Sequence, residues 1–152
     1  MNLSGNEALL DRPLVAFFAS RTAPSEAESL ARQWAHEISL SDKIVISGFH
    51  SPIERLVLDV LLLQGASVVV AIGRSLYRKI PSYLQSAYDE GRVLFVSFRD
   101  YNRPSFFNSQ LRNWAVADLA EQVVFAPFEP SSQLSTLCYS LSRGAIPTVI
   151  LQ

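Results

Sequence analysis

Six short apolar runs, separated by segments with helical spacing, constrain the fold of this chain more than any other feature. The runs are rich in Val, Ile and Phe and nearly continuous, as strands buried on both faces of a sheet require. They cover residues 14–19, 44–47, 68–72, 93–97, 123–126 and 148–151. The sequence therefore predicts a sheet that is covered by other structure on both faces.

The segments between these runs have the start signals of helices. SEAE at residues 25–28 and SPIE at residues 51–54 both match a capping box, the second with Pro52 at the first helical position. Helices are expected over residues 25–38, 52–64, 78–90, 109–120 and 132–143.

Strict alternation of strand and helix favours parallel strands joined by crossover helices, and six strands are too few for an eight-fold barrel. We expect an α/β fold in three layers, α/β/α and doubly wound, around a mainly parallel six-stranded sheet. Residues 13–152 are expected to form a single domain, preceded by a loose leader of residues 1–12.

Composition narrows the classes of partner. The chain is 49% hydrophobic and 18% charged, which excludes intrinsic disorder, and its 13 basic and 14 acidic residues give a net charge of -1. The whole surface thus lacks the basic charge typical of a duplex-DNA binder, although a local basic patch is compatible with these counts. All basic residues except Lys43 and Lys79 are Arg, whose guanidinium suits bidentate contacts with phosphate.

The single cysteine and the hydropathy pattern indicate the compartment. Cys138 has no partner for an internal disulfide or a multi-Cys metal cluster, which fits a reducing environment. The most apolar stretch, residues 56–63, is interrupted by Asp59 and is too short to cross a bilayer. We therefore expect a cytoplasmic protein with no membrane contact.

Small, hydroxylated and Arg residues follow several of the predicted strands. In open α/β sheets ligands bind outside the carboxyl ends of the strands, where helix N-termini attract anions. Ser and Thr hydroxyls and Arg are suitable partners for phosphate oxygens, and Gly allows close backbone approach, so these residues predict a phosphate or nucleotide site. The candidate ligand-binding residues are Ser20, Arg21, Ser47, Gly48, His50, Ser51, Gly73, Arg74, Arg112, Asn113, Ser131 and Ser132.

Motifs of several enzyme classes are absent from the sequence. There is no GxGxxG for a dinucleotide, no GxxxxGK for a P-loop and no GxSxG nucleophile elbow. His36 and His50 have no neighbours with metal-ligand spacing, so no metal and no cofactor are predicted. An enzyme acting on a nucleotide N-glycosidic or phosphate bond, with His50 or Glu54 as acid or base, remains an alternative.

The connection over residues 98–108 combines four aromatic residues with Arg99 and Arg103. Such interleaving suits stacking on a base, and it equally suits a lid on the core or a contact between subunits. A non-catalytic, oligomeric interaction domain is therefore a further alternative.

Four stretches of the chain match motifs of a known family in order and spacing. They are Ala19-Ser20-Arg21; Ser47-Gly48-Phe49 with Ile53-Glu54; Ala71-Ile72-Gly73 with Tyr77 and Pro81; and Phe107 with Arg112-Asn113. Over residues 14–151 the sequence resembles the Rossmann-like core of the DNA-processing protein A family (DprA/Smf), within the wider SLOG group of nucleotide-sensing domains. It departs from the family at Ala19 and Pro52, where the family has glycines.

The resemblance implies a Rossmann-like parallel sheet, self-association as a homo-oligomer, binding of single-stranded DNA and a role in DNA processing or recombination. It also implies that the matched residues among the candidates lie at the binding edge. Binding of a nucleotide or a nucleotide-derived ligand is the property that we expect to transfer most readily, because the chain is too short for the family's additional domains.

Overall fold

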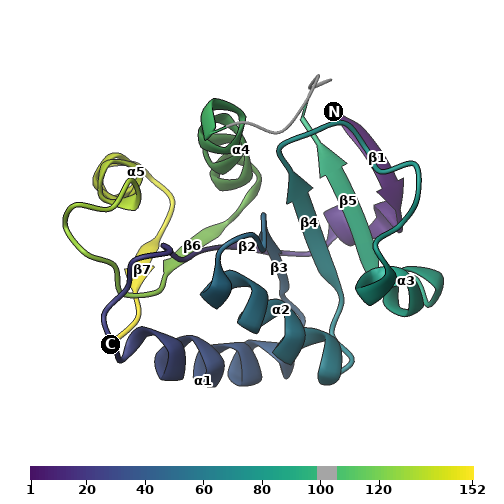
Figure 1. The fold of residues 1–152 in the computed structure, drawn as a ribbon, viewed down its shortest axis with the longest axis horizontal. Helices are drawn as coiled ribbons and strands as arrows, with labels where there is room; N and C mark the ends of the chain where they lie inside the picture. The colour runs from purple at the N-terminus through teal and green to yellow at the C-terminus, as the bar shows by residue number, and fades with distance from the viewer. Residues whose placement is uncertain (99–105) are drawn as a thin grey trace.

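A computed structural model of the chain describes the backbone of residues 1–98 and 106–152 and the side chains of residues 1–98 and 110–152. The part of the chain that is described folds into seven strands, five α-helices and one 3-10 helix (Figure 1). In chain order these are β1 (Asn2–Gly5), the 3-10 helix Glu7–Asp11, β2 (Leu14–Phe18), α1 (Ala27–Ser39), β3 (Ile44–Ser47), α2 (Pro52–Leu63), β4 (Val68–Ile72), α3 (Ser82–Asp89), β5 (Val93–Ser97), α4 (Phe106–Leu119), β6 (Gln122–Phe125), α5 (Leu134–Ser142) and β7 (Thr148–Ile150). The predicted aromatic loop falls largely outside the described residues.

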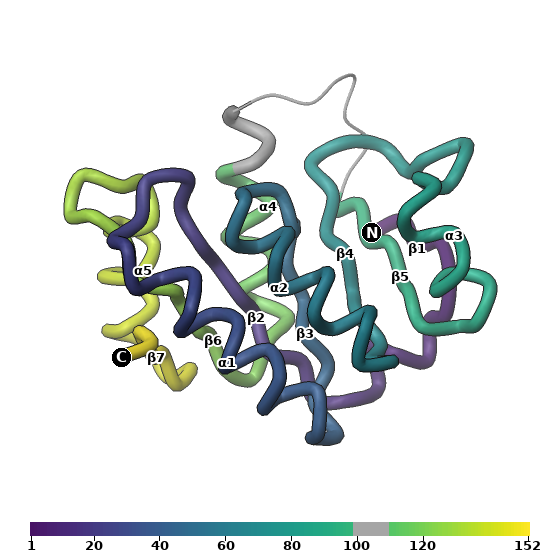
Figure 2. The backbone as a smooth tube through the Cα atoms, turned by 60° about the horizontal axis from the view of Figure 1, so that its bottom comes forward, coloured from purple at the N-terminus to yellow at the C-terminus, as the bar shows by residue number. Residues whose placement is uncertain are grey.

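All strands belong to one sheet with the order β1-β5-β4-β3-β2-β6-β7. Every neighbouring pair is parallel except β1 with β5. From β2 the chain adds β3, β4 and β5 on one side, and α4 then returns it to β6 on the other side of β2 (Figure 2). The direction of winding thus changes between β2 and β6, and this switch point is where open α/β sheets bind ligands.

Side chains of the central strands are buried on both faces of the sheet, which explains their nearly continuous apolar sequences. In β2, Val15 and Phe17 pack in the core formed with α1, α2 and α3, whereas Ala16 and Phe18 pack in the core formed with α4 and α5. The predicted three-layer α/β/α fold is therefore confirmed. No helix in the described part of the chain is both long and apolar enough to cross a membrane.

One of the five predicted helix starts, that of α2, agrees with the structure. The other four differ, and among them α4 begins three residues earlier and α5 two residues later than predicted. The capping box of α2 is formed, with the Ser51 hydroxyl accepting from the backbone N–H of Glu54. The box expected at residue 25 is not formed, because α1 begins at Ala27 after a turn in which the Ala27 N–H donates to the carbonyl of Pro24. α3 begins four residues later than predicted, directly after Pro81.

The N-terminal residues are ordered into the sheet, contrary to the loose leader expected for residues 1–12. Residues 2–5 form β1, antiparallel to β5, with Asn2 opposite Ser97. The Asn6 side chain then donates to the carbonyl of Gly91 at 2.8 Å and accepts from the N–H of Ala8 at 3.1 Å. The pairing with β5 and the bond from Asn6 to Gly91 are long-range contacts, and they fix a segment whose own sequence has no strand pattern.

Candidate functional site

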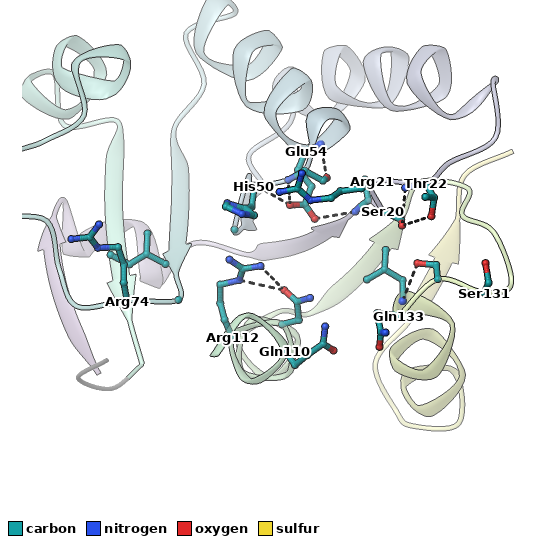
Figure 3. A pocket seen from close by; sticks show the side chains of 18 of the residues that line it. Ser20, Arg21, Thr22, His50, Glu54, Arg74, Gln110, Arg112, Ser131 and Gln133 are labelled. Carbon is teal, nitrogen blue, oxygen red and sulfur yellow. Dashed lines mark hydrogen bonds between the residues drawn. The ribbon is translucent and has the colours of Figure 1, made fainter. Parts of the chain in front are cut away.

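A cavity of about 690 Å³ opens at the carboxyl ends of the strands, around the switch point (Figure 3). Such a volume lies in the range of small-molecule and nucleotide sites. Eleven of the twelve candidate residues line it, all except Ser47. Eight further residues complete the wall: Ala19, Thr22, Glu54, Ile72, Tyr77, Gln110, Gln133 and Leu134.

Ser47, at the end of β3, is fully buried beneath the site and does not reach the cavity. Its hydroxyl accepts the backbone N–H of Phe49 at 3.0 Å, and Phe49 has a positive φ of 48°. This side chain therefore stabilises a strained turn, and its expected contact with a ligand is not supported by its position.

Glu54 joins the loops that follow β2 and β3. Its carboxylate is buried and accepts three backbone N–H groups, from Ala19 at 3.0 Å, from His50 at 2.9 Å and from Ser51 at 3.2 Å. These bonds use both oxygens, Oε2 for Ala19 and Oε1 for the other two. Glu54 thus holds two neighbouring walls of the cavity at a fixed distance from each other.

Arg112 brings a buried positive charge to the cavity from α4. The residue is 7% exposed, and its Nε and Nη2 donate to Oδ1 of Asn113 at 3.4 and 3.2 Å. A Cβ atom at Gly48 would lie only 2.6 Å from the Arg112 Cζ, so the missing side chain of Gly48 makes room for this guanidinium. Figure 3 shows Arg112 facing the α2 side of the cavity, where His50, Glu54 and Arg21 lie.

The charge around His50 is positive. Burial of part of the imidazole lowers the pKa of His50 below its ordinary value of 6.5, and the neighbouring Arg112 and Arg21 lower it further, whereas Glu54 acts in the opposite direction. His50 is consequently neutral at pH 7. Burial is the larger cause of the lowered pKa, and the contributions of Arg112 and Arg21 show that two positive charges act at this point of the cavity, a suitable environment for an anion.

The hydroxyl groups at the other end of the cavity are partly engaged by the protein itself. Ser132 is buried and its hydroxyl accepts the N–H of Leu134 at 3.2 Å, at the start of α5. The Ser20 hydroxyl accepts the N–H of Thr22, also at 3.2 Å. Ser131 and Gln133 lie on this side of the cavity (Figure 3). Ser20 and Ser132 therefore shape the loops in addition to lining the cavity.

Several lining residues were missed by sequence reasoning for identifiable reasons. Gln110 lies three residues before Asn113 on α4, so the i, i+3 spacing of one helix face would have indicated it. Glu54 was predicted to cap α2 and, in the enzyme alternative, to act as acid or base. Its bond to Ala19 in another loop leaves no local signal in the sequence.

The donor set favours an anion over a metal ion. Within the described residues no three His, Cys, Asp or Glu side chains come together as a metal would require. Arg21, Arg74 and Arg112 line the same cavity, and Glu54, the only carboxylate among the described residues of its lining, is directed to backbone donors. Phosphate groups match this arrangement.

Comparisons with known proteins define the fold. No family model matches the sequence, and no curated protein matches it. The chain superposes over 97% of its length on DNA processing protein A from Helicobacter pylori, with a TM-score of 0.77 and 18% sequence identity, and covers 69% of that chain. The H. pylori structure was determined to explain how that protein binds single-stranded DNA. DNA processing protein A from Streptococcus pneumoniae gives a TM-score of 0.76 and 22% identity over the same share.

A more distant match is the molybdenum cofactor carrier protein from Chlamydomonas reinhardtii, with a TM-score of 0.56 and 12% identity over 91% of this chain and 76% of that one.

The present chain covers 52% of the S. pneumoniae protein, about half of its length. By its structure, this chain has the Rossmann-like α/β fold of the core of DNA processing protein A, as the sequence resemblance implied.

Proposed function

We propose that this chain binds single-stranded nucleic acid through backbone phosphates held in the cavity at the switch point. The main supporting observation is the Arg112 guanidinium, which is buried against Gly48 at the wall of a cavity that Arg21 and Arg74 also line. A buried cation at the carboxyl edge of a parallel sheet suits a phosphate ligand. The fold shared with a protein that binds single-stranded DNA supports the same proposal.

The site favours binding over hydrolysis. Both oxygens of Glu54 accept backbone N–H groups, so this carboxylate serves the loops and is poorly placed to accept a proton from water. Besides His50 and the arginines, the titratable acids and bases among the described residues that line the cavity are Glu54 and Tyr77. A role in DNA processing or recombination, a cytoplasmic location and assembly into a homo-oligomer are parts of the same proposal.

Arg112→Gln is expected to weaken binding of a thymidine oligonucleotide by about tenfold or more, because a charge-assisted contact with phosphate is lost. In the wild type, the logarithm of the association constant should fall linearly with the logarithm of the salt concentration. The slope should be less steep by about 0.7 to 1 in the variant. Fluorescence anisotropy at several salt concentrations measures both quantities.

Arg143→Gln provides the matched control, since Arg143 lies outside the cavity beside Tyr139. An identical salt slope for the wild type and Arg112→Gln would contradict the assignment of Arg112 to phosphate. A wild type that binds no oligonucleotide at any salt concentration would refute the proposed function.

Affinity for an oligonucleotide without a terminal phosphate is expected to rise as the pH falls from about 7 to about 5. A bound phosphodiester raises the pKa of His50, whereas in the protein alone this pKa lies below 6.5. Binding is therefore accompanied by uptake of a proton. Affinity increases as the pH falls through the pKa of His50 in the complex, and it levels off below the pKa of His50 in the free protein. His50→Gln should flatten this dependence, and His36→Gln, at an exposed position of α1, should preserve it.

A further inference from the structure

The loop between β4 and α3 carries a local excess of positive charge. Residues 60–88 contain Arg74, Arg78 and Lys79 but no Asp or Glu. Arg74 lines the cavity, and Arg78 and Lys79 are exposed on the same loop. The positive region of the site thus extends from the cavity toward the start of α3.

Two tyrosines along this region are each stacked with an arginine. The Arg74 Cζ lies 4.7 Å from the ring centre of Tyr77, and Tyr77 lines the cavity. The Arg55 Cζ lies only 3.6 Å from the ring centre of Tyr83, in the first turn of α3. Tyr83 is nevertheless 47% exposed, so a large part of its ring surface is open to other partners.

A short stretch of chain joins the two stacks. Tyr83, in the first turn of α3, follows Tyr77 by six residues, and its hydroxyl is the second cause, after burial, that raises the pKa of Tyr77. Arg55 follows Glu54 of the cavity wall directly in α2. Neither Arg55 nor Tyr83 is among the residues that line the cavity, so the pair lies outside it, next in the chain to one wall residue, Glu54, and six residues after another, Tyr77.

The charges beside Arg55 favour a base over a phosphate at this position. Asp59 Oδ1 lies 3.8 Å from the Arg55 Nε, and Arg32 in the adjacent hollow pairs with Glu28 at 3.2 Å. These carboxylates offset the two guanidinium charges. Stacked aromatic and guanidinium planes bind any base through its π face and do not require a net charge.

We infer that Arg55 and Tyr83 form a base-binding position beside the phosphate cavity, on which the base of the adjacent nucleotide stacks as a third layer. This inference rests on the proposed function, because the cavity holds the phosphate of the preceding nucleotide. Arg78 and Lys79 contact the backbone between the two positions. The ligand is accordingly an extended strand of at least several nucleotides, and an isolated mononucleotide fills only part of the site.

The test compares thymidine 5′-monophosphate with an eight-nucleotide thymidine strand. Tyr83→Ala should weaken binding of the longer strand by roughly 5- to 150-fold and leave binding of the mononucleotide unchanged. Tyr83→Phe should retain the affinity of the wild type, because it keeps the stacking ring. A 2-aminopurine base in the longer strand should lose its fluorescence quenching with Tyr83→Ala and keep it with Tyr83→Phe.

Tyr139→Ala is the matched control, since Tyr139 is exposed and stacked with Arg143 away from the cavity. Tyr83→Leu keeps a large apolar side chain without an aromatic ring, and thermal unfolding curves of each variant and the wild type show whether the structure is retained. The two measurements separate loss of stacking from loss of structure. Unchanged binding of the longer strand by Tyr83→Ala overturns the inference, as does an equal loss for both ligands. In either case, weaker oligonucleotide binding by Arg112→Gln would still support the proposed function. A wild type that binds neither ligand would refute both the proposed function and this inference.

Discussion

Glu54→Ala is expected to lower the free energy of unfolding by about 3 kcal/mol, because it leaves three backbone donors without their acceptor. Those donors belong to Ala19, His50 and Ser51, and the Ala19 and Ser51 residues are themselves buried. For a chain of this length the midpoint of thermal unfolding should fall by about 6 to 12 °C. Differential scanning calorimetry and urea titration measure the two quantities.

Two further variants make this expectation specific. Glu54→Gln should recover part of the loss, because an amide keeps one oxygen but presents an N–H donor to a backbone donor. Glu28→Ala, which removes an exposed carboxylate paired with Arg32 in the first turn of α1, should change stability little. A Glu54→Ala protein as stable as the wild type would show that the cross-link between the two loops is unimportant.

Gly48→Ala is expected to weaken oligonucleotide binding by about 10- to 100-fold while stability stays nearly constant. A Cβ atom at this position would lie 2.6 Å from Cζ, 2.8 Å from Nη1 and 2.9 Å from Nε of Arg112. Gly48 does not have a positive φ, so alanine introduces no backbone strain and the flexible guanidinium is the group that moves. The anisotropy assay used for Arg112→Gln measures the effect.

A double-mutant cycle identifies Arg112 as the cause. If Gly48→Ala acts by displacing this guanidinium, it should add almost nothing to the loss already produced by Arg112→Gln. Gly144→Ala is the control, because Gly144 lies outside the cavity and its added Cβ would meet only the Leu141 carbonyl oxygen at 3.4 Å. Fully additive losses would show that Gly48 contributes to binding independently of Arg112.

The central strands and the position of the site were predictable because their signals are local. Burial on both faces demands apolar residues at successive positions, and β2, β4 and β5 have them. The helix start at Ser51 follows from four consecutive residues. Since parallel strands end at one edge, residues placed after different strands, such as Arg21 and Arg74, could be assigned to one cavity before their contacts were known.

Features that depend on contacts between distant residues were not predictable. The strand β1 has no strand pattern of its own and exists because β5 offers a free edge. The sequence likewise does not reveal that Gly48 gives space to Arg112, or that Glu54 bonds to Ala19. Ser47 is a different case, because a polar residue at a strand end is predicted to contact a ligand, whereas in the structure it lies outside the cavity lining and its hydroxyl bonds within its own turn.

The pairing of β1 with β5 has a consequence for folding during synthesis. Asn2 emerges from the ribosome long before its partner Ser97, and at about 5 to 20 residues per second the delay is about 5 to 20 s. Throughout that interval β1 has no strand to pair with, while β2, β3 and β4 become available to one another. The N-terminal strand therefore docks late, and slow translation of residues 93–97 prolongs the time for which it is accessible to chaperones and proteases.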